Sequence, residues 1–218
     1  MKKIPLIFLI FLSSFISKAQ FLNSFGINSG ISFTNQHVEL YQIDYKLETK
    51  TKIGFYTEVF LERTINEKFA FSVNFGYQQK GSCSDFYGYA INHIENNEVE
   101  ILKGDDYKFF IDYFSFYPLI IYKLNFQHFD LLPFIGPRID ILSCYSTDSQ
   151  FGKPDCNKLI AGLTVGAELQ YTLSRFAIGV ECKEMIDFTN AVNANGLKIR
   201  NNAFNVGLKL KFFIHQPA

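Results

Sequence analysis

Residues Phe204 to Phe212 read Phe-Asn-Val-Gly-Leu-Lys-Leu-Lys-Phe, so that large apolar residues alternate with asparagine, glycine and lysine. Successive side chains of a β-strand point to opposite faces, and this stretch therefore predicts a strand with one wholly apolar face and one polar face. Lysines on the second face argue against a strand that is buried in hydrocarbon on both sides. The apolar face must meet an apolar surrounding, which is either a protein core or lipid.

The same alternation recurs about eight times along the chain. The other predicted strands cover residues 24–33, 51–62, 69–80, 107–124, 130–142, 159–171 and 176–186. Residues 107–124 are apolar on both faces and contain Pro118, so their facing stays open, and a bulge at the proline would shift the register. Cys182 lies on the apolar face of its strand and is interpreted as a small hydrophobe.

The start of the chain has the features of a secretory signal peptide. Lys2 and Lys3 precede an apolar run from Ile4 to Ile16, and small residues follow at Ser17 and Ala19. This run is too short for a spanning helix, and no later segment approaches the ~18 continuous apolar residues of one. We predict a signal peptide over 1–19, cleaved near Ala19, and one barrel domain over 20–218. Any membrane span must then be made of strands.

The connections between the predicted strands alternate in length. Residues 34–50, 81–106, 143–158 and 187–199 form long connections, and residues 63–68, 125–129 and 173–175 form short ones. This alternation is typical of outer-membrane barrels whose termini lie in the periplasm. The sequence therefore predicts an all-β fold, an eight-stranded antiparallel transmembrane β-barrel with short periplasmic turns and long external loops. The expected location is the outer membrane of a Gram-negative bacterium.

A soluble secreted barrel or sandwich is the alternative fold. It would expose the polar faces, which here are rich in Gly, Ser, Asn and Thr with scattered charges, whereas a solvated face usually carries a denser mix of Lys and Glu. Without residues 1–19 the chain has 18 basic and 21 acidic residues. It thus lacks the excess of basic residues that is typical of nucleic-acid binding. Composition thus favours the membrane barrel.

Four segments carry a family resemblance: Phe114 to Lys123, Pro133 to Arg138, Gly162 to Leu169 and Asn201 to Leu208. They resemble the PorT-type outer-membrane β-barrel family, which is common in Bacteroidota. The first segment is similar to the family's Tyr-Leu-Glu-Ile-Pro-Leu-Leu-x-Lys stretch, and the third to its Gly-x-x-x-Gly-x-Gly-x-Glu strand. The resemblance implies the same barrel fold. Some members are linked to protein secretion, and that link is not carried over to this chain.

The inward faces of the predicted barrel carry four acids and four bases. These residues are predicted to form a lumen charge network: Glu58, Arg138, Asp140, Glu168, Glu181, Lys183, Lys209 and Lys211. An eight-stranded barrel is just wide enough for its own side chains to fill, and unpaired charges inside it would be costly. We therefore expect a salt-bridged plug, with a narrow gated channel as the alternative.

Three cysteines fall in or beside the predicted external loops. A disulfide between Cys144 and Cys156 would close the third long loop, and a closure of this length stabilises by about 3 kcal/mol in the chain-entropy description. A bond that involves Cys83, or no bond, are the alternatives. No Cys-x-x-Cys or His-Cys spacing suggests zinc, and no cofactor is expected.

Catalysis would need a nucleophile, a base and an orienting group within reach of one another. His37, His93, Ser82, Ser84 and Asp85 fall in predicted external loops, but no spacing ties them together. We therefore predict no enzymatic activity. A lipid-modifying outer-membrane enzyme with loop His and Ser residues is the alternative.

The predicted role is structural, or one of surface interaction and assembly. The expected partners are outer-membrane lipid, the barrel-assembly machinery and a protein bound at the external loops, with no nucleic acid, and the barrel is expected to be a monomer. The acidic second loop contains an Asn96-Asn97 step that could turn a hairpin above the membrane. An exposed edge of such a hairpin could pair with a partner strand.

Overall fold

The structure is a computed structural model that describes residues 22–40, 45–47, 50–88, 102–127, 129–147, 156–194 and 197–214. The predicted signal peptide lies outside these residues. In the part of the chain that is described, there is no helix with the length and hydrophobicity needed to cross a bilayer.

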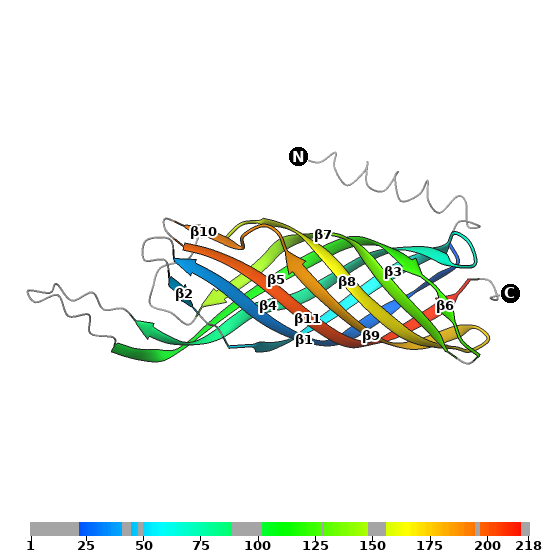
Figure 1. The fold of residues 1–218 in the computed structure, drawn as a ribbon, viewed down its shortest axis with the longest axis horizontal. Coiled ribbons are helices and arrows are strands. Elements are labelled where there is room, and N and C mark those ends of the chain that lie inside the picture. The colour runs from blue at the N-terminus through cyan, green and yellow to red at the C-terminus, as the bar shows by residue number, and fades with distance from the viewer. Residues whose placement is uncertain are drawn as a thin grey trace, which may run out of the picture.

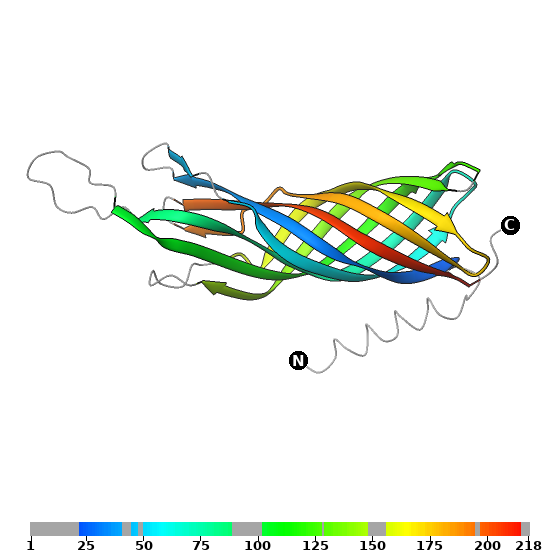
Figure 2. The same cartoon turned by 90° about the horizontal axis from the view of Figure 1, so that it is seen from below.

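Eight long antiparallel strands close into a barrel (Figures 1 and 2). The elements are β1 (Ser24–Leu40), β2 (Tyr45–Leu47), β3 (Lys52–Thr64), β4 (Phe69–Gly88), β5 (Leu102–Tyr122), β6 (Leu124–Asn125), β7 (Asp130–Thr147), β8 (Leu159–Thr172), β9 (Phe176–Asp187), β10 (Val192–Ala194) and β11 (Leu197–Phe213). Around the wall the order is β1, β3, β4, β5, β7, β8, β9 and β11, and β11 pairs again with β1. The predicted eight-stranded antiparallel fold is confirmed.

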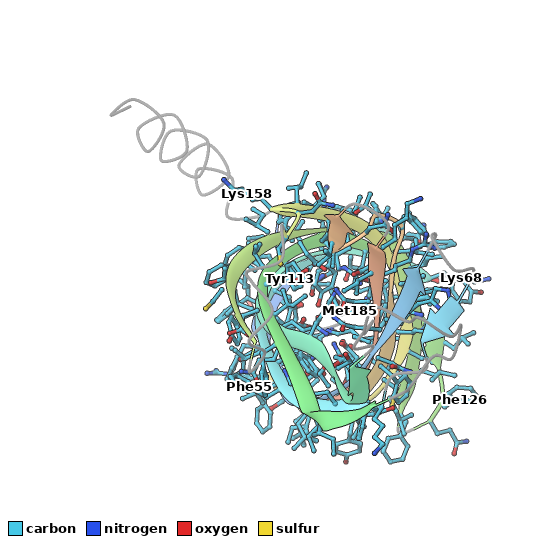
Figure 3. All side chains as sticks on the ribbon, turned by 90° about the vertical axis from the view of Figure 1, so that its left-hand side faces the viewer. Phe55, Lys68, Tyr113, Phe126, Lys158 and Met185 are labelled. Carbon is cyan, nitrogen blue, oxygen red and sulfur yellow. The ribbon has the colours of Figure 1, made fainter. Side chains whose placement is uncertain are left out.

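The predicted facing of the strands is also found. Leu208 at the middle of β11 is 67% exposed on the outer surface, whereas its neighbour Lys209 is 2% exposed and points inward. The same alternation holds along β1, β3 and β9. Viewed from the loop end of the barrel, Phe55 and Phe126 point outward and Tyr113 and Met185 point into the interior (Figure 3). An apolar outer face around a polar interior is the arrangement that lipid requires.

Aromatic rings gather on the outer surface near the short-turn end of the barrel. Phe25 stacks on Phe212 with ring centroids 5.7 Å apart, and Phe69 contacts Tyr122 at 5.2 Å. Phe129 and Tyr171 form a third such pair at 5.5 Å. Girdles of aromatic residues flank the apolar band at the membrane interfaces of outer-membrane barrels.

The open question of residues 107–124 is settled by β5. Tyr113, Tyr117 and Leu119 point into the barrel, and Phe114 and Phe116 point outward. The register with β7 is the same above Pro118 (Phe116 with Ile139) and below it (Ile120 with Ile135), so the proline causes no shift. The shift lies higher, between Asp112 and Tyr113.

The β5–β7 ladder is interrupted at Pro118 because of the residue that lies opposite it in β7. The common register places Pro118 across from Pro137, and neither residue has an N–H to donate. Residues 117–119 of β5 accordingly have no partner in β7 among the pairs that the two strands form. The strands remain close there, because Gly136 brings its backbone against the carbonyl oxygen of Pro118.

Gly136→Ala is expected to destabilise the barrel by about 1–3 kcal/mol, because a Cβ at this position would collide with the Pro118 carbonyl oxygen. Gly54→Ala is the matched control, since its Cβ would lie 3.1 Å from the Cβ of Gln79 and needs only a small adjustment. Urea unfolding in lipid vesicles measures both. Equal effects of the two changes would contradict the close approach at Gly136.

Several strands run further than their alternation predicts. β1 continues to Leu40, β4 to Gly88 and β7 to Thr147, and β5 and β11 begin at Leu102 and Leu197, so parts of the predicted long loops are strand. The apolar face ends where lipid ends, while the backbone ladder continues beyond it. β4 and β5 remain paired up to Gly88 and Leu102, as a ribbon above the membrane. The Asn96-Asn97 step lies outside the described residues.

Candidate functional site

The interior of the barrel holds a balanced set of charges. Six acids and six bases are buried among the described residues. They are Glu58, Glu62, Asp140, Glu168, Glu181, Asp187, Lys52, Lys80, Arg138, Lys183, Lys209 and Lys211. All eight residues of the predicted charge network are in this set. An interior with equal numbers of opposite charges can be neutralised by pairing alone.

Lys183 is the centre of the network. Its ammonium lies 2.7 Å from Glu58, 2.9 Å from Glu181 and 2.8 Å from the hydroxyl of Tyr117. The Asn28 amide nitrogen donates to both carboxylates, at 2.9 Å to Glu58 and 2.8 Å to Glu181. These side chains come from β1, β3, β5 and β9, so the cluster ties strands together across the barrel.

Lys209 forms ion pairs with two acids that would otherwise repel each other. Glu168 of β8 stands directly opposite Glu181 of β9, and like charges in that position repel. The Lys209 ammonium lies 2.9 Å from Glu168 and 3.2 Å from Glu181, and it also packs over the ring of Phe60 at 4.4 Å. The lysine that first marked β11 as a membrane strand therefore holds three strands in register.

A second cluster lies towards the loop end. Lys80 contacts Asp140 at 2.7 Å and Asp187 at 2.9 Å, and the Arg138 guanidinium binds the same two carboxylates. Gly162 lies on β8, between β7 and β9, and pairs with both Arg138 and Asp187. The Arg138 side chain reaches Asp187 across this glycine. A Cβ at Gly162 would collide with the backbone carbonyl oxygen of Ile186 and would lie 2.7 Å from the guanidinium, so this position requires glycine.

Sequence reasoning missed four charges of the interior: Lys52, Glu62, Lys80 and Asp187. The first three stand on the inward parity of predicted strands, and that parity was the signal that could have found them. Asp187 lies one residue beyond its predicted strand. Tyr117 was missed because both faces of its strand are apolar.

Neutral polar side chains, such as Asn74 and Gln78, and apolar side chains make up the rest of the described interior. Tyr117, Leu119, Ile121, Leu132 and Phe134 form one packed cluster with Ala70, Met185 and Ala203. Ion pairs, neutral polar groups and apolar side chains thus all lie buried inside the barrel, which at eight strands is just wide enough for its own side chains.

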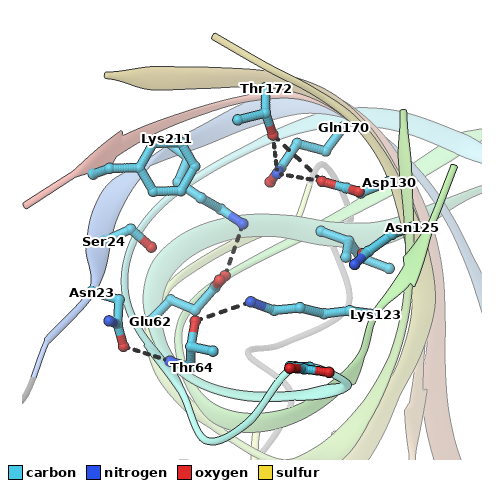
Figure 4. A pocket seen from close by; sticks show the side chains of 13 residues that line it. Asn23, Ser24, Glu62, Thr64, Lys123, Asn125, Asp130, Gln170, Thr172 and Lys211 are labelled. Carbon is cyan, nitrogen blue, oxygen red and sulfur yellow. Dashed lines mark hydrogen bonds and ion pairs between the residues drawn. The ribbon is translucent and has the colours of Figure 1, made fainter. Parts of the chain in front are cut away.

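A pocket of about 710 Å³ opens at the short-turn end of the barrel (Figure 4). Its inner end carries Lys211 paired with Glu62 at 2.9 Å. Lys123, which follows β5, and Asp130, which starts β7, also line the pocket. Burial lowers the pKa of the Lys123 ammonium from its ordinary value, and the nearby Glu62 carboxylate opposes that shift.

The structure does not contain the predicted disulfide between Cys144 and Cys156. Cys144 is exposed on β7, whereas Cys156 is buried in a cluster with Ile111, Tyr113 and Val192. The two thiols thus lie in opposite surroundings, inside and outside the wall. The side chain of Cys83 lies outside the described part of the structure. Cys182 is exposed on the outer face, as predicted.

The residues of the alternative enzymatic reading are not brought together where they are described. His37 is exposed on the outer face of β1. Ser82 is buried, and its hydroxyl donates to the side-chain amide oxygen of Gln36 at 2.6 Å, inside the barrel. His93 lies outside the described residues, as do the side chains of Ser84 and Asp85. Among the described residues there is also no group of His, Cys, Asp and Glu that could hold a metal ion.

The sequence matches a known family model. The sequence model described as "Outer membrane protein beta-barrel domain" matches residues 17–193, which is most of the chain. A search of curated proteins finds no match.

Among solved structures, similarity is distant. Ail, the attachment invasion locus protein of Yersinia pestis, was crystallised with a heparin analogue and is 17% identical, with a TM-score of 0.43, over 88% of this chain and 99% of Ail. Neisserial surface protein A is 15% identical, with a TM-score of 0.45, over 86% of this chain and 97% of its own. The outer membrane protease OmpT of Escherichia coli is 10% identical, with a TM-score of 0.43, over 88% and 97%. Their activities are not carried over to this chain.

Proposed function

The chain belongs to the outer membrane protein beta-barrel domain family and resides in the outer membrane of a Gram-negative bacterium, and from this premise we propose that it is a closed, non-enzymatic barrel. Its role is structural, or one of surface interaction. We place it in the PorT-type branch found in Bacteroidota on the four segments quoted above. Residues 1–19 then serve as the signal peptide, and the mature chain inserts as a monomer through the barrel-assembly machinery.

The observation that carries this proposal is the ion-paired interior. The ammonium of Lys183 has two carboxylates and a hydroxyl within 2.9 Å, and the Lys80 ammonium has two carboxylates within the same distance. Opening a path for ions would require these buried contacts to separate, and breaking a buried pair costs about 3–5 kcal/mol. An ion-paired lumen of this kind supports a closed barrel rather than an ion channel.

Surface interaction is supported by the strands that pass beyond the apolar band. In the β4–β5 ribbon and at the extended ends of β1 and β11, the paired backbone continues above the lipid. A protein partner bound there would meet hydrogen-bonded strands.

Reconstitution in planar bilayers tests the closed lumen. The purified barrel is expected to give no steady single-channel conductance, while an open porin in the same bilayers gives full currents. Steady open pores formed by the unmodified protein would overturn the proposal, because the ion-paired interior could not then be a plug.

A further inference from the structure

The pocket at the short-turn end presents a lysine and an aspartate whose hydrogen bonds go to neutral groups, and the Glu67 carboxylate also lines it. The Lys123 ammonium donates to the hydroxyl of Thr64 at 2.9 Å. The Asp130 carboxylate accepts from the amide of Gln170 at 3.5 Å and the hydroxyl of Thr172 at 3.4 Å. Figure 4 shows Lys123 reaching into the pocket and Asp130 beside Gln170 and Thr172. Lys211, by contrast, is held by Glu62 and closes the inner end of the pocket.

Two further polar atoms of the lining are buried without a partner among the described residues. They are the hydroxyl of Ser24, in a residue that is 1% exposed, and the side-chain carbonyl oxygen of Gln170, in a residue that is 5% exposed. A buried polar atom without a hydrogen bond is costly, and a pocket that contains such atoms is suited to a polar ligand. The Ser24 hydroxyl can donate or accept, and the Gln170 oxygen accepts N–H groups.

We propose that this pocket binds a small zwitterion, a free amino acid or short peptide, on the periplasmic side of the barrel. The ligand carboxylate binds the Lys123 ammonium, and the ligand ammonium binds the Asp130 carboxylate with help from the Gln170 oxygen. A volume of about 710 Å³ is in the range of small-ligand pockets and holds a molecule of this size.

The charge pattern explains why a zwitterion fits better than a singly charged ligand. An anion would satisfy Lys123 and leave Asp130 with its neutral partners, and a cation would do the reverse. A ligand with both charges gains two charge-assisted hydrogen bonds, which are stronger than the bonds that each protein group has now. Because Lys211 and Glu62 hold each other, they offer a ligand less than Lys123 and Asp130 do.

Calorimetric titration of the purified, nanodisc-reconstituted barrel with three dipeptides tests the proposal. The probes are alanyl-alanine, its N-acetylated form and its C-terminal amide, so that the second and third lack one charge each. Alanyl-alanine is expected to bind at least tenfold more tightly than either blocked form. Lys123→Gln and Asp130→Asn are each expected to weaken its binding by about tenfold or more, or about 1.4 kcal/mol.

Lys68→Gln is the control, because Lys68 is an exposed lysine of the neighbouring turn outside the pocket lining. It should leave the affinity unchanged. Absence of binding at millimolar dipeptide would overturn the proposal, as would equal binding of all three probes or an equal loss in the Lys68 variant. Circular dichroism of each variant confirms that the barrel is folded before titration. The bilayer measurement is independent of this result, since the pocket ends below the plugged lumen.

Discussion

Leu208→Arg is expected to destabilise the folded barrel in a bilayer by about 2–4 kcal/mol, the cost of a cationic side chain on the lipid face at mid-depth. Leu208 is the middle of the five outward residues between Phe204 and Phe212, and 67% of its surface is exposed. Arginine there must leave water for hydrocarbon or drag water and headgroups towards the bilayer centre. Urea unfolding in lipid vesicles, followed by circular dichroism and heat-dependent gel mobility, measures the change.

Asn202→Arg is the matched control for depth. Asn202 lies on the same strand and the same exposed outer face, but above Phe204. Near the interface the cost of arginine falls to about 0–1 kcal/mol. If both changes cost the same, or if Leu208→Arg has no effect, the outward face of β11 does not meet the centre of a bilayer.

Lys183→Met is expected to cost about 3–5 kcal/mol, because it leaves Glu58 and Glu181 buried without the ammonium between them. Part of this loss should return when Glu58→Gln is added, since the Glu58 charge that lost its lysine is then removed, while Glu181 keeps Lys209 at 3.2 Å. A double-mutant cycle by urea unfolding gives the coupling between the two residues.

Lys68→Met serves here as the control for removing a lysine from an exposed turn, and it should change stability by less than about 0.5 kcal/mol. Costs of Lys183→Met and Glu58→Gln that simply add would contradict a direct contact in the folded barrel. A loss below about 1 kcal/mol for Lys183→Met would indicate that water already reaches the pair.

The outward faces of the barrel could be predicted from the sequence because lipid imposes one rule on all of them. Each strand inside the bilayer must present apolar side chains at every second residue, and Ile27, Val59 and Ile178 obey this as plainly as Leu208. Above the bilayer, strands need no apolar residue at every second position. β1, β4 and β11 continue there as paired strands without the alternation by which a strand is recognised in the sequence.

The interior could be predicted only where it is polar. Glu181, Lys183 and Lys209 stand out against apolar neighbours, whereas Tyr117, Leu119 and Ile121 face the lumen from a strand that is apolar on both sides. Contacts across the barrel depend on register as well as on parity. Arg138 meets Asp187 because both residues pair with Gly162, which lies between them. This contact depends on the registers of the β7–β8 and β8–β9 pairs, and the sequence of one strand does not reveal them.

The same reasoning explains the cysteines. Cys144 and Cys156 are close in sequence and lie at the two ends of a predicted loop, which is why the sequence predicts a disulfide between them. The structure carries Cys156 inward to Ile111 and Val192 and leaves Cys144 outside. Chain proximity does not reveal on which side of a wall each end of a loop will lie.

The pairing of β1 with β11 has a consequence for the order of events in folding. The first strand depends on the last for one of its two ladders, from Ser24 with Phe213 to Leu40 with Leu197. Until β11 arrives, β1 and β9 would both present unpaired backbone groups, and hydrocarbon offers nothing to pair with them. Insertion strand by strand would leave these groups unpaired, so we expect β11 to pair with β1 as the barrel enters the membrane, with ring closure and insertion as a single step.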